Sequence, residues 1–87
     1  MSDQEIKERI KKLIINHVLD EDDSIEIEND QPLMELGIGI DSVSTLEFLV
    51  ALENEFGINI DESSIEIETL ENVESISDFV GGMISKQ

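Results

Sequence analysis

The sequence predicts a small all-α fold: a helical bundle of three main helices plus one short helix, with a long loop between helices one and two. Two observations predict it. Apolar residues recur at spacings of three and four in three separate segments, which is the period of an amphipathic helix. The chain has 87 residues, 39% of them hydrophobic, which is enough for one modest core. We therefore expect a single domain over residues 1–87, in which three apolar stripes pack together.

The charge and composition of the chain exclude several functions. Twenty-two acidic and five basic residues give a formal net charge of −17, which repels nucleic acid and anionic membranes and attracts basic protein surfaces. Cysteine is absent, so disulfides, thiolate metal sites and cysteine nucleophiles are excluded. The N-terminal residues contain no apolar run that suggests secretion or membrane insertion. We expect a monomeric cytoplasmic protein with no nucleic-acid or membrane partner.

The first main helix is predicted at about residues 3–18. Ser2 and Glu5 have the spacing of a capping box at its start. Its apolar stripe consists of Ile6, Ile10, Leu13, Ile14 and Val18. Four of the five basic residues of the chain lie at 7–12, within this helix. His17 is the only histidine, and without a second histidine or a cysteine nearby it predicts no metal or catalytic site.

The segment DEDDSIEIENDQPL, at residues 20–33, predicts a long loop without a helix, because it is polar, strongly acidic and contains the only proline. An EF-hand calcium loop that began at Asp20 would need glycine in place of Ile25. It would also need a bidentate glutamate in place of Gln31. No metal site is therefore predicted.

The motif SIEIE occurs twice, at residues 24–28 and 64–68. Its alternation of apolar and acidic residues, taken alone, would suggest two strands. Two isolated five-residue strands would form a marginal sheet. We therefore expect extended loop segments that place their isoleucines under the helices.

The second main helix is predicted at about residues 42–56. Its core stripe consists of Leu46, Leu49, Leu52 and Phe56. Gly57 follows as a C-terminal stop signal. The rest of the helix forms a mixed apolar and acidic face, made of Val43, Glu47, Val50, Glu53 and Asn54.

The last third of the chain predicts a short helical turn at about residues 66–70 and a final helix capped by Asn72. The apolar residues of that final helix are Val73, Ile76, Phe79, Val80 and Ile84. Gly81 and Gly82 are expected to fray its end. The predicted core consists of Ile6, Ile10, Leu13, Leu46, Leu49, Leu52, Phe56, Val73, Ile76 and Phe79.

Ser42 stands where the second main helix begins, within LGIGIDSVSTLEFL. On the local pattern, Asp41 or Ser42 is a helix cap that contributes about 1 kcal/mol. A hydroxyl at a helix N-terminus also lies near free amides and the positive end of the dipole, which favours a phosphate-bearing group. The chain offers no base for Ser42 as a nucleophile, since His17 stands alone and no Gly-x-Ser-x-Gly motif occurs. A cap and an acceptor for another enzyme therefore both remain open.

The segment ELGIGIDSVSTLEFLVALENEFGINID resembles the signature of acyl carrier proteins, in which an Asp-Ser-(Leu/Ile/Val) element opens the second helix. DQPLMELGI and IDESSIEIETLENVESISDFV resemble the flanking loop and the later helices of that family, so the resemblance covers nearly the whole chain. It implies that a phosphopantetheinyl transferase attaches 4′-phosphopantetheine from coenzyme A to Ser42. It also implies that Asp41 helps to place the metal and coenzyme A in the transferase complex.

The resemblance implies a carrier and not an enzyme. Acyl or aminoacyl intermediates would be held as thioesters on the arm, which supplies the thiol that the chain lacks. The carrier would shuttle them between acyl-loading, condensing and transfer enzymes of fatty acid, polyketide or related biosynthesis. Basic patches on these enzymes would be attracted to the acidic chain. The mixed face of Val43, Glu47, Val50, Glu53 and Asn54 would be the docking surface.

Three features depart from the commonest housekeeping form of the family. The approach GIGIDS is one residue longer, Asn54 stands where an acidic residue is frequent, and no proline follows GINI. These departures favour a specialised carrier of a dedicated pathway. The alternative function is an acidic interaction adaptor that is never modified.

Overall fold

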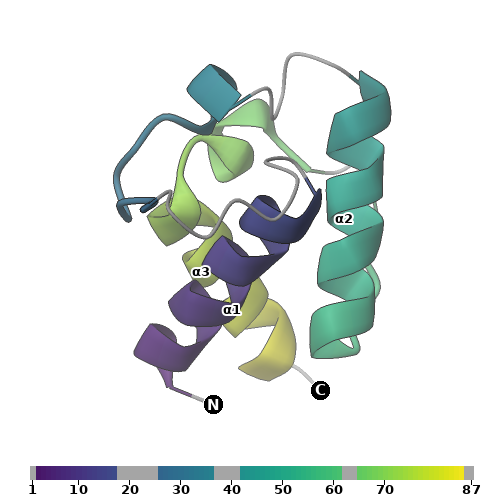
Figure 1. The fold of residues 1–87 in the computed structure, drawn as a ribbon. Coiled ribbons are helices and arrows are strands. Elements are labelled where there is room, and N and C mark those ends of the chain that lie inside the picture. The colour runs from purple at the N-terminus through teal and green to yellow at the C-terminus, as the bar shows by residue number, and fades with distance from the viewer. Residues whose placement is uncertain (1, 18–25, 37–41, 62–64, 86–87) are drawn as a thin grey trace.

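The computed structural model describes residues 2–17, 26–36, 42–61 and 65–85. These residues form three α-helices, two short 3₁₀ helices and no strand, which confirms the predicted all-α fold. The elements in chain order are α1 (Asp3–His17), η1 (Leu33–Leu36), α2 (Ser42–Phe56), η2 (Ile67–Leu70) and α3 (Val73–Ser85). Helix α1 packs against both α2 and α3, and η2 packs against α3 (Figure 1).

Helix α1 begins and is buried as its sequence predicts. The Glu5 amide donates a 3.2 Å hydrogen bond to Ser2 Oγ, which is the cap half of the predicted capping box. The Ile6 amide donates to the Ser2 carbonyl oxygen at 3.0 Å. Of the predicted stripe, the residues Ile6, Ile10, Leu13 and Ile14 are all buried, whereas Val18 lies outside the described residues.

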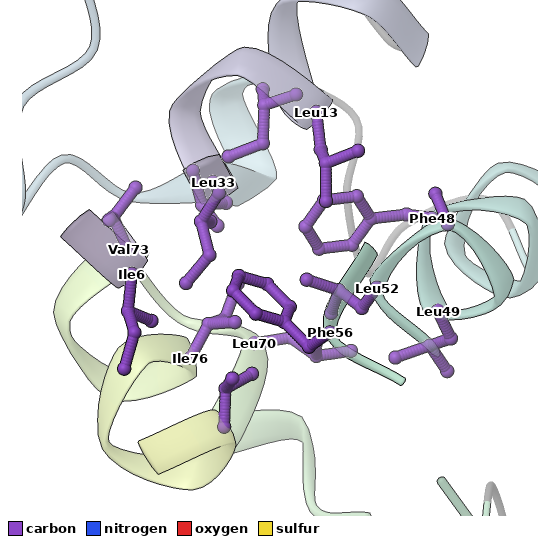
Figure 2. Close-up of a cluster of buried hydrophobic side chains, with 14 of the residues drawn as sticks. Ile6, Leu13, Leu33, Phe48, Leu49, Leu52, Phe56, Leu70, Val73 and Ile76 are labelled. Carbon is purple, nitrogen blue, oxygen red and sulfur yellow. The ribbon is translucent and has the colours of Figure 1, made fainter. Parts of the chain in front are cut away.

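Helix α2 has the predicted limits, but its core stripe differs from the prediction at one residue. Leu46 was expected in the core and is 41% exposed, whereas Phe48 is fully buried. Figure 2 shows Phe48, Leu52 and Phe56 pointing from α2 into the buried cluster. Since α2 carries apolar residues around more than one face, its period alone admits more than one stripe. Packing against α1 selects the stripe that contains Phe48.

The connection before α2 contains a short helix that was not predicted. A 3₁₀ helix runs over Leu33–Leu36. The sequence predicted a loop without any helix over residues 20–33, so the helix begins at the last residue of that loop. Leu33 is fully buried, and its amide donates a 2.8 Å hydrogen bond to the carbonyl oxygen of Glu71, just after η2. A contact with a residue distant in the sequence therefore positions this turn.

The isoleucines of the two SIEIE segments have different environments, and Ile25 lies outside the described residues. Ile27 is buried and Ile65 packs partly buried against the core, as expected for extended segments under the helices. Ile67 is 61% exposed, so the expectation was wrong for this residue. It opens η2, the predicted short helix, and the buried residue of that turn is Leu70 instead.

Helix α3 starts at the predicted cap and continues past the predicted point of fraying. The Ser75 amide donates a 2.8 Å hydrogen bond to Asn72 Oδ1, and the Asn72 amide donates to Ser75 Oγ at 3.2 Å. The helix extends through Gly81 and Gly82 to Ser85, so the expected fraying was wrong. Neighbouring apolar residues explain this, because Val80 is buried and both Met83 and Ile84 pack against the core.

Candidate functional site

The candidate site is built around the start of α2. Ser42 is the first residue of this helix, as predicted, although its side chain and the whole of Asp41 lie outside the described residues. This end of α2 is at the opposite end of the molecule from the N- and C-terminal ends of the chain (Figure 1). The N-terminal end of an α-helix is the positive end of its dipole, so this end of α2 favours an anionic group.

The first turn of α2 differs in charge from the other helix starts. It contains no acidic residue. The first turns of the other four described helices contain at least one each: Asp3 and Glu5, Glu35, Glu68, and Glu74. In a chain with a net charge of −17, residues 42–45 thus add no carboxylate that would repel a phosphate from the positive end of the helix dipole, and Asp41 is the acidic residue nearest to them in the sequence. These residues fit a phosphodiester attached at Ser42.

An exposed apolar row continues from this end along α2. The exposed fractions are 62% for Val43, 41% for Leu46 and 47% for Val50. Spacings of three and four residues place them along one side of the helix. Sequence reasoning assigned Leu46 to the core and so missed it here, although its spacing from Val43 and Val50 was a signal for this side.

A groove of about 600 Å³ lies between α1 and α2, beside this row. Its lining consists of Leu13 from α1 and Leu46, Glu47, Val50, Ala51, Asn54 and Glu55 from α2. Arg9 of α1 pairs with Glu55 across the two helices, with Nη1 at 3.1 Å from Oε2. The groove thus combines apolar walls with acidic side chains, a composition that suits a partner surface with apolar and basic groups.

The predicted docking residues have two kinds of environment. Val43, Glu47, Val50 and Asn54 are all exposed. Glu53 is half-buried, and its Oε2 accepts a 2.7 Å hydrogen bond from the Ile60 amide. The chain reaches Ile60 through Gly57, whose φ of 65° lies in the left-handed region and ends α2 as predicted.

The described part of the chain has neither a metal-ligand cluster nor a membrane-spanning helix. No group of three or more His, Asp or Glu side chains there is placed to hold a metal ion. No helix among these residues is both long and apolar enough to cross a membrane. The side chain of His17 lies outside the described residues.

Comparisons with known proteins agree on the chemistry of this site. A family model described as "Phosphopantetheine attachment site" matches residues 8–80, a range that includes all of α2. An acyl carrier protein of Zymomonas mobilis is 41% identical over 59 residues, which cover 68% of this chain and 72% of that protein. Both matches extend well beyond the segment around Ser42.

Proposed function

The chain belongs to the acyl carrier protein family, and from that premise we propose that it carries acyl or aminoacyl groups as thioesters on a 4′-phosphopantetheine arm attached to Ser42. Membership makes the protein a phosphopantetheine carrier and not an enzyme. The proposal depends mainly on one observation. Ser42 is the first residue of a helix whose first turn contains no acidic side chain.

The chain itself contributes an acceptor and its surroundings. Attachment would form an ester bond between Ser42 Oγ and the phosphorus that carries pantetheine. It would break the phosphoanhydride bond of coenzyme A and release adenosine 3′,5′-bisphosphate, while the serine proton passes to a base. The positive end of the α2 dipole would stabilise the negative charge of the resulting phosphodiester. The bound group supplies a terminal thiol, which a chain without cysteine cannot supply. The transferase would supply the base, because His17 is the only histidine of the chain and no Gly-x-Ser-x-Gly motif surrounds Ser42.

The proposed docking surface follows from exposure and charge. Val43, Glu47, Val50 and Asn54 are exposed on α2, and Leu46 joins them. The partners would be the phosphopantetheinyl transferase and acyl-loading, condensing and transfer enzymes with basic patches. A net charge of −17 would speed encounters with such surfaces, and a shuttle needs rapid exchange between partners. We also propose that the carrier serves a specialised polyketide, lipid or aminoacyl pathway. The reason is that GIGIDS, Asn54 and the missing proline after GINI depart from the commonest housekeeping form of the family.

Intact mass tests the proposed function. The apo protein would be incubated with coenzyme A and a broad-specificity phosphopantetheinyl transferase, and peptide mapping would locate any added mass. We expect one phosphopantetheine at Ser42, none in Ser42→Ala, and normal loading of the matched control Ser44→Ala. Ser42→Ala should fold and lose at most about 1 kcal/mol of stability. Asp41→Ala should load more slowly.

Two outcomes would contradict the proposal. Loading of Ser42→Ala at another serine would refute the assignment of the site. A wild-type protein that gains no mass, while a known carrier in the same reaction does, would favour the unmodified acidic adaptor.

A further inference from the structure

The three carboxylates of α2 have different partners. Glu55 pairs with Arg9 on α1, and Glu53 accepts a hydrogen bond from the Ile60 amide. The Glu47 side chain is exposed, and its carboxylate makes neither a hydrogen bond nor an ion pair with the part of the chain that the structure describes. Residues on one predicted docking face are therefore not equally available to a partner.

Glu53 holds the segment that follows α2 at two atoms. Its backbone oxygen accepts a 3.2 Å hydrogen bond from the Ile58 amide, and its Oε2 accepts the 2.7 Å bond from Ile60. Ile58 and Ile60 are 5% and 8% exposed and belong to the core cluster, while Asn59 between them is exposed. One glutamate thus fixes both amides of the residues that insert these isoleucines into the core.

From these contacts we propose that Glu53 is a positioning residue for the segment 58–60, and that its charge is not one that the partner enzymes meet. The second half of this proposal rests on the proposed carrier function, whereas the first half does not. A bidentate pair between Glu53 and a partner's guanidinium would need both carboxylate oxygens. Such a pair would compete with the Ile60 amide for Oε2.

Substitution by glutamine separates the two roles. Glutamine keeps a side-chain oxygen as acceptor and removes the charge. Glu47→Gln and Glu53→Gln each remove one negative charge from the same helix, so each variant controls for the loss of net charge in the other. Glu53→Ala removes both the charge and the acceptor.

The experiment measures kcat/KM for loading by the phosphopantetheinyl transferase at low salt and at about 1 M salt, where the screening length is about 3 Å. Glu47→Gln should lower kcat/KM several-fold at low salt, mainly through KM, and the deficit should shrink at high salt. Glu53→Gln should stay within about twofold of the wild type at both salt concentrations. Glu53→Ala should have a lower kcat/KM than the wild type at both salt concentrations. Glutamine at position 53 would then restore loading, because it restores the side-chain acceptor without the charge.

Amide hydrogen exchange in the unloaded protein provides a second measurement, which needs no partner. The Ile60 amide should exchange about tenfold or more faster in Glu53→Ala, because a hydrogen bond to a charged acceptor is lost. It should stay protected in Glu53→Gln. A wild-type protein that does not load would contradict the proposed function, yet this measurement would still test the role of Glu53.

Two results would overturn the inference. If Glu53→Gln loses as much kcat/KM as Glu47→Gln with the same salt dependence, then Glu53 is a charge contact for the partner. If Ile60 exchanges at the wild-type rate in Glu53→Ala, then the carboxylate does not hold the segment.

Discussion

Helices α2 and α3 both supply core residues, but they differ in what they leave exposed. The apolar residues of α3 are all buried or partly buried against the core: Val73, Ile76, Phe79, Val80, Met83 and Ile84. Helix α2 buries Phe48, Leu49, Ala51, Leu52 and Phe56 and still exposes Val43, Leu46 and Val50. An interaction surface is indicated when a helix exposes a row of apolar side chains that the core does not need. The difference indicates that α3 serves the fold, whereas α2 serves the fold and recognition.

The arrangement of the helices explains this difference. Helix α1 makes the extensive contacts with both of the other helices, so α2 has one face on α1. Figure 1 shows α2 along one side of the molecule, with α1 and α3 crossing beside it. Leu46 and Val50 border the groove that α2 forms with α1, so this side of α2 stays exposed beside the contact between the two helices.

Two leucines on α2 provide the strongest test of this comparison. Leu49 is 3% exposed and Leu46 is 41% exposed, so the same substitution probes the two faces of one helix. Leu49→Ala should lower the free energy of unfolding by about 2–5 kcal/mol, because it leaves a cavity in the core. Leu46→Ala should cost less than about 1 kcal/mol. Urea denaturation at a fixed ionic strength measures both.

Equal losses in these two variants would break the comparison, since Leu46 would then belong to the core. A small domain has only about 5–15 kcal/mol of total stability. Leu49→Ala could therefore be largely unfolded, in which case Leu49→Val provides a milder variant at the same site.

The exposed row should matter for partners more than for stability. Val50→Ala should weaken association with the phosphopantetheinyl transferase by about 1 kcal/mol, roughly fivefold, because apolar contact area is lost at the interface. The loss should persist at high salt, since it does not depend on charge. Surface plasmon resonance at two salt concentrations measures it, with Glu26→Gln in the loop before η1 as a control for net charge. A loss that vanishes at high salt would contradict an apolar contact.

The limits of α2 could be predicted from sequence, but its orientation could not. Gly57 signals the end of the helix by local chemistry alone, and the structure agrees. The choice between Leu46 and Phe48 depends on how α2 lies on α1, which no local pattern contains. In the same way, η1 forms where the Leu33 amide meets the Glu71 carbonyl, a contact between segments far apart in the sequence.

The candidate site was predicted to a similar extent. The position of Ser42 at the start of α2 follows from a motif of neighbouring residues, and the structure places the helix start there. The engagement of Glu53 was not predictable, because it requires the chain to turn at Gly57 and return the Ile60 amide to the helix. Local signals therefore identify the helix start, whereas tertiary contacts decide which carboxylates remain available.

The start of α3 provides a test of a smaller effect. Asn72→Ala should lower the free energy of unfolding by about 1 kcal/mol, because the Ser75 amide loses its acceptor. Loading at Ser42 should be unaffected if α3 serves only the fold. Thermal denaturation and the loading assay measure the two effects. A change in loading larger than the change in stability would assign α3 a role in recognition.

Gly82 of α3 should give the smallest effect, and one of opposite sign. A Cβ at this position would meet no atom within 4 Å, and the residue lies inside the helix. Gly82→Ala should therefore stabilise the protein by about 0.5–1 kcal/mol, because alanine loses less backbone entropy on forming a helix. Gly57→Ala is the matched control at the end of α2. There the φ of 65° makes the same substitution destabilising. Chemical denaturation of both variants measures the two signs, and a Gly82→Ala protein no more stable than the wild type would show that the last turn of α3 is not helical in solution.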